Sequence, residues 1–137
     1  MKEGWHNDDY FILFETQEEA KLATARYELA NSLPGFVIIG LLGWDDFILS
    51  DANSNYYTVP TVPSDKEEIR SFVFPAETMK LESDTRFSNK IKWYIKPIIF
   101  DGSPTEKENM VWITHEQHAE AVRFWNTTYR EIKNKTA

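Results

Sequence analysis

Two histidines near the C-terminus come nearest to the spacing of a metal site. His115 and His118 are three residues apart, with Glu116 between them. A zinc-binding helix of the metalloprotease kind places its two histidines four residues apart, and the ion needs a third protein ligand. Here the spacing is one residue short and no third ligand is in view. We therefore predict no metal site and no cofactor, with His118 at the edge of the core and His115 facing solvent.

The aspartates in the middle of the chain are the other candidates for catalysis. Asp45 and Asp46 are adjacent on an expected strand, where neighbouring side chains point to opposite faces, and that does not suit a cooperating acid and base. As charged residues at the edge of a strand, they would instead discourage one sheet from pairing with another. Asp51, Asn53 and Asn55 alternate as in a calcium loop, but the glycine and the distal glutamate of such a loop are missing. We interpret this segment as a turn.

Other catalytic motifs are missing from the sequence. It has no cysteine, and therefore neither a disulfide nor a thiolate nucleophile. It also has neither a glycine-rich phosphate loop nor a G-x-S-x-G nucleophile turn. We predict that the protein is not an enzyme. The alternative is a small hydrolase whose carboxylates, from Asp46, Asp51 or Glu77, meet only in three dimensions.

The charge balance favours a protein partner over a nucleic acid. The 137 residues include 22 acidic and 15 basic side chains, for a formal net charge of -7. A nucleic-acid ligand needs Lys and Arg to neutralise its phosphates, whereas an acidic surface attracts a basic protein and speeds association. The same charge would also serve solubility alone. Because no run is apolar enough for a signal peptide or a membrane span, we expect a soluble cytoplasmic protein without membrane contact.

A central segment, residues 33–63, contains the elements that must hold these side chains. It has three runs rich in β-branched and aromatic residues, separated by clusters of Gly, Asp, Asn and Ser. This pattern is typical of a three-stranded antiparallel meander. Residues 80–92 have no sustained period and are expected to form a mobile loop or an irregular crossover. The strands expected in the whole chain are residues 10–14, 36–39, 46–49, 56–59, 91–100 and 110–113. In the fifth of these, Pro97 requires an edge position or a bulge.

Three capping motifs predict where helices begin. Thr16 with Glu19, and Thr114 with Gln117, have the three-residue spacing of a capping box, in which each side chain bonds to the other residue's backbone amide. The first box opens a helix over residues 17–31, and the second opens a helix that runs to about residue 133. Ser64 is the third expected cap, at the start of a short helical turn.

The periodicity of these elements predicts the fold class. The strand pattern places Phe47 and Leu49 on one face of the sheet. The first helix is expected to pack through a single stripe of residues. This stripe is Leu22, Ala25, Arg26 and Leu29, widened by Ala23, Tyr27 and Ala30. Residues 1–9 are expected to be a flexible arm. We predict a single α+β domain over residues 1–137, with a mainly antiparallel sheet of five to six strands packed by two long helices. The expected core stripe of the last helix is His118, Ala121, Val122, Trp125, Tyr129 and Ile132.

The order of these elements resembles the SUKH superfamily. The resemblance covers residues 16–74 and rests on an early helix followed by LPGFVIIG, GWDDFILSD and YYTVPTVP, and then by a helical S-D-K-E-E and an aromatic run. Members of this superfamily are α+β domains related to yeast cell-wall assembly regulators and, in bacteria, mostly immunity proteins that bind and neutralise toxins. The resemblance therefore implies a protein-binding domain of the immunity type.

The expected binding surface lies on the turns of the meander, because loops on a rigid sheet often carry binding residues. The leading hypothesis is a non-enzymatic, protein-binding immunity module that covers a basic toxin with an acidic, aromatic surface. Trp44 is the expected anchor of that surface, and its aspartates are expected to steer the partner. A phage or housekeeping structural protein is a further alternative to the hydrolase. The expected partner-binding residues are Trp44, Asp45, Asp46, Asp51, Asn53 and Tyr56.

Overall fold

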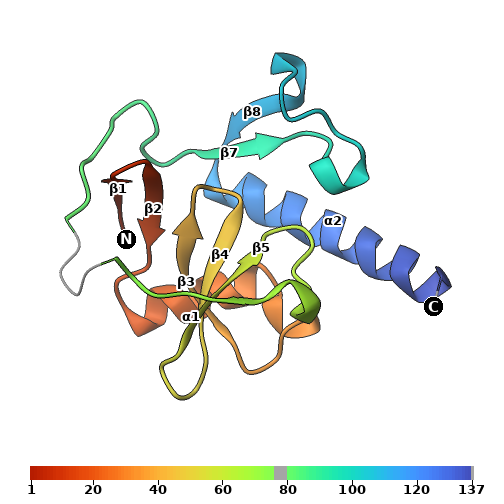
Figure 1. Cartoon of the computed structure of the whole chain (residues 1–137), viewed down its shortest axis with the longest axis horizontal. Coiled ribbons are helices and arrows are strands. Elements are labelled where there is room, and N and C mark those ends of the chain that lie inside the picture. Colours follow the sequence, from red (N-terminus) through yellow and green to blue (C-terminus); the bar gives the residue numbers. More distant parts are fainter. Residues whose placement is uncertain (76–79, 137) are drawn as a thin grey trace.

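The chain forms a six-stranded antiparallel sheet, a separate two-stranded hairpin and two helices (Figure 1). The computed structural model describes residues 1–75 and 80–136, so Glu77 lies outside the described residues. The six strands follow one another in the sheet in sequence order, and the predicted α+β class is confirmed. The strands of the sheet are β1 Lys2–His6, β2 Asp9–Leu13, β3 Val37–Leu42, β4 Asp46–Ser50, β5 Tyr56–Pro60 and β6 Arg70–Ser71.

The remaining elements lie against one face of the sheet or beside it. The hairpin pairs β7, Ile91–Tyr94, with β8, Met110–Ile113. The expected strand over residues 91–100 is therefore shorter than predicted, because the chain turns at Pro97 into a short 3-10 helix. The helical elements are α1 Gln17–Arg26, η1 Leu29–Asn31, η2 Lys66–Glu68, η3 Ile98–Phe100, η4 Lys107–Asn109 and α2 His115–Thr136. Among the helices that the structure describes, none has the length and apolarity needed to cross a membrane.

The N-terminal segment is a strand rather than the expected arm. All five residues of β1 pair with β2, and the outer edge of β1 is also covered, because the Trp5 and Glu82 backbones exchange hydrogen bonds of 2.8 and 2.9 Å. The Trp5 indole packs on Tyr10 with ring centroids 5.1 Å apart. A polar composition suggested a loose arm, but pairing on both edges and a packed indole order the segment.

Two of the three predicted helix caps are confirmed. The Thr16 hydroxyl accepts a 3.0 Å hydrogen bond from the Glu19 amide. Thr114 and Gln117 bond reciprocally, at 3.0 and 3.1 Å. The prediction for Ser64 is wrong, because its hydroxyl is turned inward and donates to the carbonyl of Thr61 at 2.9 Å. The next residue, Asp65, caps η2 instead.

The first helix is shorter than predicted and packs through one side of the predicted stripe, which includes Ala23, Tyr27 and Leu29. It ends at Arg26, and Glu28 then adopts a left-handed conformation with φ 52°. Ala20, Ala23 and Tyr27 are buried, whereas Leu22 is 60% exposed. Ala25 and Arg26, on the other side of the stripe, are exposed. The buried side carries the small residues Ala20 and Ala23, and small side chains let a helix backbone approach its neighbour closely.

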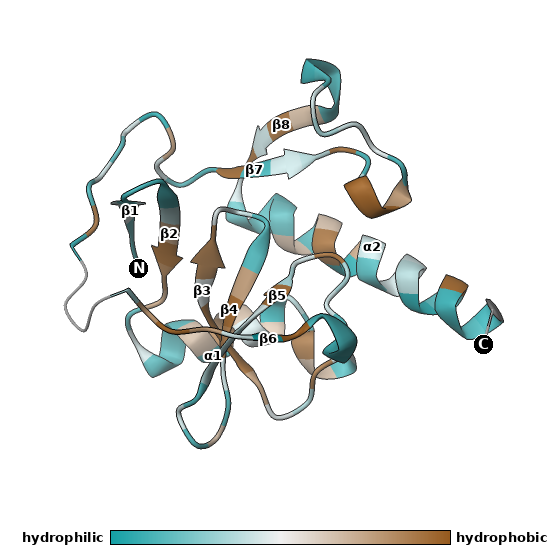
Figure 2. Ribbon diagram, in the orientation of Figure 1, coloured by the Kyte–Doolittle hydropathy of each residue, from teal (hydrophilic) through white to brown (hydrophobic). Residues whose placement is uncertain are grey.

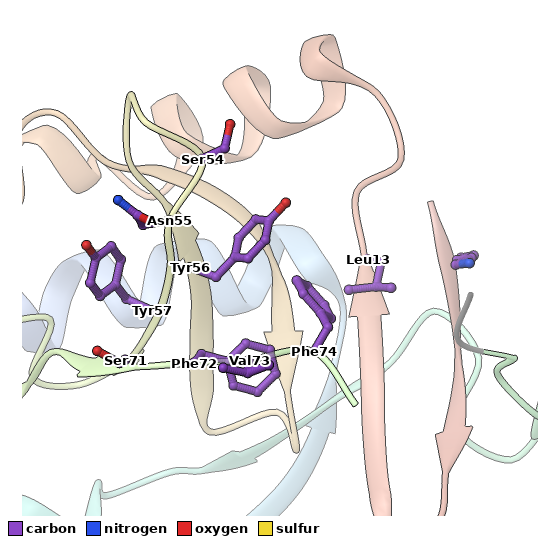
Figure 3. A pocket seen from close by; sticks show the side chains of 10 residues that line it. Leu13, Ser54, Asn55, Tyr56, Tyr57, Ser71, Phe72, Val73 and Phe74 are labelled. Carbon is purple, nitrogen blue, oxygen red and sulfur yellow. The ribbon is translucent and has the colours of Figure 1, made fainter. Parts of the chain in front are cut away.

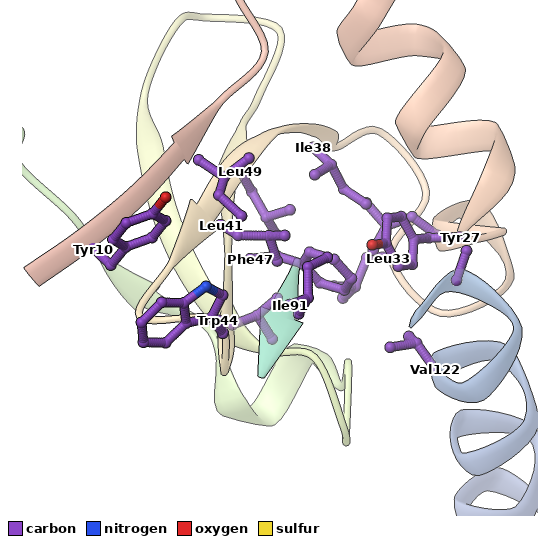
Figure 4. Close-up of a cluster of buried hydrophobic side chains, with 14 residues drawn as sticks. Tyr10, Tyr27, Leu33, Ile38, Leu41, Trp44, Phe47, Leu49, Ile91 and Val122 are labelled. Carbon is purple, nitrogen blue, oxygen red and sulfur yellow. The ribbon is translucent and has the colours of Figure 1, made fainter. Parts of the chain in front are cut away.

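The main core lies between the sheet and the layer formed by the helices and the hairpin (Figure 4). Phe47 and Leu49 face this core, as predicted, and Ile48 faces the other side of the sheet with Phe11. Apolar residues are concentrated on the central strands, and also on η3, which lies outside the sheet (Figure 2). The fully buried core side chains include Tyr10, Ile12, Ile38, Leu41, Phe47, Leu49, Val59, Ile91 and Val122.

Candidate functional site

A small cleft opens where the β3–β4 turn meets the segment after β7. Its volume is about 180 Å³. The sheet contributes two adjacent aspartates and the end of β5, and the segment of residues 93–99 contributes an apolar wall. We call this hollow the acidic cleft. Its lining residues are Asp45, Asp46, Pro60, Thr61, Val62, Trp93, Tyr94, Pro97, Ile98 and Ile99.

The turn between β3 and β4 places both aspartates at the cleft. Gly43 and Trp44 both have positive φ, 60° and 63°, so the chain reverses within the turn. Asp45 belongs to this turn and not to the strand, and its carbonyl accepts a 2.9 Å hydrogen bond from the Thr61 amide. Asp45 is therefore not on the strand as expected, so the alternation of faces along a strand does not apply to it, and both aspartates line the cleft.

The two carboxylates form no ion pair with a described residue, although the charge of Lys92 acts on Asp45. Burial by neighbouring protein atoms raises the pKa of Asp45, although the residue keeps an exposed surface, and Lys92 counteracts part of that rise. Burial also raises the pKa of the half-buried Asp46, and the negative charge of Asp45 raises it further. Neither side chain forms an ion pair or a hydrogen bond with a described residue. A cation placed in the cleft would offset the repulsion between the two carboxylates and favour their ionised forms.

The walls of the cleft suit the stem of a cationic side chain. Trp93, Tyr94, Ile98 and Ile99 offer apolar surface beside the two carboxylates. Lys and Arg side chains commonly place their methylene groups along apolar surface and their charge at a polar end. Pockets for small-molecule ligands are typically about 300 to 1,000 Å³, so this cleft has room for one side chain and little more.

The expected anchor of the binding surface is not on the surface. Trp44 is only 9% exposed and stacks on Tyr10, with ring centroids 4.8 Å apart. It also contacts Trp5, Phe87 and Trp112 edge to face. We correct the prediction accordingly: Trp44 is a core residue that holds the β3–β4 turn in place, and a partner cannot reach its indole without unpacking this cluster.

The other predicted acidic residue lies at the far end of the sheet. Successive turns of a meander are at opposite ends of the strand between them, and five residues at about 3.3 Å each put roughly 17 Å between Asp46 and Asp51. The Asp51 carboxylate accepts hydrogen bonds of 2.9 Å from the amides of Asn53 and Asn55, and of 3.0 Å from the Tyr57 hydroxyl. These bonds lower the pKa of Asp51. The turn interpretation is confirmed, and the two turns do not form one surface.

Tyr56 lines a second, larger hollow, which we call the aromatic groove (Figure 3). The groove has a volume of about 760 Å³ and lies over the β4–β5 loop and the segment that follows β6. Tyr56 packs on Phe74, and Phe74 on Phe72, with centroid distances of 5.1 and 5.0 Å. Lys2 is the one charged residue among the described residues that line it.

The histidines are buried deeper than the sequence suggested. His118 is fully buried rather than at the core edge, and its Nδ1 lies 2.6 Å from the Tyr27 hydroxyl. Burial lowers its pKa to about 3. His115 is half-buried rather than facing solvent, and burial lowers its pKa as well. Within residues 1–75 and 80–136, no three His, Asp or Glu side chains are grouped so as to hold a metal ion.

The sequence pointed to the aspartates of the cleft but not to its opposite wall. Residues 91–100 were expected to form one strand entering the core, and such a strand would bury the residues that instead border the cleft. Pro97 was interpreted as an edge or a bulge of that strand, whereas the strand ends at Tyr94 and a 3-10 helix follows the proline. Comparisons with protein-family models, with curated proteins and with solved structures found no match for this chain. Membership of the SUKH superfamily therefore stays a prediction.

Proposed function

We propose that this chain is a non-enzymatic protein-binding module of the immunity type, which binds a basic protein toxin and neutralises it. The observation that carries the proposal is the acidic cleft, where Asp45 and Asp46 lie close together, form no ion pair with a described residue, and have the charge of Lys92 acting on Asp45 alone. Binding would place a Lys or Arg side chain of the toxin between apolar walls and against the two carboxylates. Interfaces that cover an active site need no catalytic residue of their own.

Charge supports a basic partner at two distances. The net charge of -7 raises the rate at which a basic protein meets this chain, and salt screens that effect. At contact, the half-buried Asp46 favours a cation more strongly than a fully exposed carboxylate would, because screening by water is weaker there, and the neighbouring Asp45 adds a second negative charge. Long-range attraction and local recognition then favour the same class of partner.

The geometry gives less support to the hydrolase alternative. Asp46 and Asp51, separated by the whole of β4, are too far apart for a carboxylate pair, which needs about 5 to 9.5 Å. The acidic cleft is smaller than a typical ligand pocket. The aromatic groove is large enough, but its described lining contains no carboxylate and no histidine.

The test is protection against a toxin encoded by the gene next to that of this chain. Co-expression of the two proteins should restore growth, and they should co-purify. The double variant Asp45→Asn/Asp46→Asn should lose protection, because the cationic side chain no longer meets negative charge. The matched control is Asp8→Asn/Asp9→Asn, which removes the same charge from exposed residues and should protect like the wild type. Full protection by the cleft variant, or equal loss in both variants, would refute binding through the cleft.

A further inference from the structure

The acidic cleft continues into exposed apolar surface on η3 and α2. Ile98 and Ile99 line the cleft, yet they are 50% and 46% exposed. The next residue, Phe100, packs on Trp125 of α2 with ring centroids 4.9 Å apart. Trp125 in turn contacts Phe124, which is 61% exposed, at 5.1 Å. These five residues form an unbroken series of contacts and chain neighbours, which we call the η3–α2 patch.

The arrangement of the patch distinguishes it from ordinary surface apolar residues. Single exposed apolar side chains are normal on any protein, and Leu22 on α1 is an example at 60% exposure. Neighbouring exposed residues with aromatic rings, next to partly buried charge, are typical of a protein interface. The patch borders the cleft directly, because Ile98 and Ile99 belong to both.

We infer that the cleft and the η3–α2 patch together bind one amphipathic helix of a basic protein. This inference rests on the proposed function and names the partner's binding element. Large apolar side chains of the helix would cover Phe124, Trp125 and the isoleucines, and a Lys or Arg one turn away would enter the cleft. Residues three or four apart on a helix are about 5 to 6 Å apart, so both groups can lie on the same side of it.

Charge complementarity selects this occupant over two others. A second copy of the chain would bring another net charge of -7 to the surface, with two further aspartates. A wholly apolar partner would cover Asp45 and Asp46 without supplying a counterion, and burying a charge without a partner is strongly unfavourable. A helix with an apolar face and a cation at its edge avoids both penalties.

The test uses three synthetic helical peptides of equal length and the full chain. The first has a leucine face bordered by lysines, the second has glutamate in place of the lysines, and the third has serine in place of the leucines. Fluorescence anisotropy at physiological salt should show that the first peptide binds at least about tenfold more tightly than either of the others. If the first and third peptides bind equally, the patch does not take part.

Matched variants locate the binding on the protein. Phe124→Ser and Asp45→Asn/Asp46→Asn should each weaken binding of the first peptide about tenfold or more. Leu22→Ser, which removes an equally exposed apolar side chain from the other helix, and Asp8→Asn/Asp9→Asn should bind like the wild type. Circular dichroism and urea unfolding establish that the variants are folded before they are compared.

The possible results separate this inference from the proposed function. If Phe124→Ser binds like the wild type while the cleft variant protects poorly against the toxin, the inference is wrong and the proposed function stands. If the cleft variant protects fully, the proposed function fails, and the inference fails with it. Sedimentation at micromolar concentration tests whether two copies of the chain associate through the patch. If the wild type is a dimer and Phe124→Ser is a monomer, the patch serves self-association and the inference is wrong.

Discussion

The Tyr27 hydroxyl and His118 Nδ1 share a 2.6 Å hydrogen bond inside the core. The two residues are 91 positions apart, and the bond joins the C-terminal cap of α1 to the first turns of α2. Their rings also pack edge to face, with centroids 5.4 Å apart. This buried polar contact links the helix that follows β2 to the helix that ends the chain.

Tyr27→Phe should destabilise the protein by about 1 to 3 kcal/mol, because the histidine nitrogen would remain buried without a partner. Urea unfolding at pH 7 measures the change in the free energy of unfolding. Tyr56→Phe is the control, since Tyr56 is 38% exposed, and it should change stability by less than about 0.5 kcal/mol. A neutral Tyr27→Phe would mean that the bond contributes nothing to stability.

Stability should fall as the pH drops below the ordinary range of histidine. The pKa of His118 is lowered to about 3 in the fold, so between about 3 and 6.5 the unfolded chain binds a proton that the native chain does not. Stability then decreases by up to about 1.4 kcal/mol for each pH unit of acidification. Unfolding midpoints from pH 6.5 to 5 measure this slope. His118→Asn should flatten it, and an unchanged slope in that variant would contradict the assignment to His118.

Each confirmed helix cap should contribute measurably to stability. Thr16→Ala and Thr114→Ala should each cost about 1 kcal/mol, because an amide of the first helical turn loses its acceptor. Thr85→Ala, at an exposed loop position, is the control. Urea unfolding distinguishes these cases, and two neutral cap variants would show that the helices do not depend on these boxes.

Trp44 should be more important for stability than Trp125. Trp44 is 9% exposed within an aromatic cluster, and Trp44→Ala should cost about 3 to 5 kcal/mol, the range for deletion of a buried large aromatic. Trp125 is half-buried at the edge of the η3–α2 patch, so Trp125→Ala should cost less. Denaturation curves of the two variants show which substitution lowers the free energy of unfolding more. A larger loss for Trp125→Ala would place the centre of the core nearer to α2.

Asp51 should organise its loop without contributing to partner binding. Asp51→Asn weakens the acceptor that holds the Asn53 and Asn55 amides, so these amides should exchange hydrogen faster. Hydrogen exchange followed by NMR reports each amide separately. Protection against the toxin should be unchanged, because the loop lies at the other end of β4 from the acidic cleft. If the variant loses protection, Asp51 is part of the partner-binding surface after all.

Features that depend on residues close together in the chain could be read from the sequence. The Thr16 and Thr114 boxes involve partners three residues away, and the meander depends on alternation within short runs and on turn residues between them. Such interactions form between neighbours whatever the rest of the chain does. The strands of the meander and the starts of both helices were therefore predictable.

Features that depend on distant partners required the tertiary structure. Residue types do not reveal that Trp5 pairs with Glu82, that Tyr27 meets His118, or that Trp44 is enclosed by rings from four other segments. The acidic cleft combines a turn near residue 45 with a wall near residue 98, and only long-range packing brings them together. Local pattern limits which face of an element is apolar, but the choice between similar faces depends on what packs against them. For that reason the aspartates were foreseeable as candidates, whereas the shape of their site and the burial of the expected anchor were not.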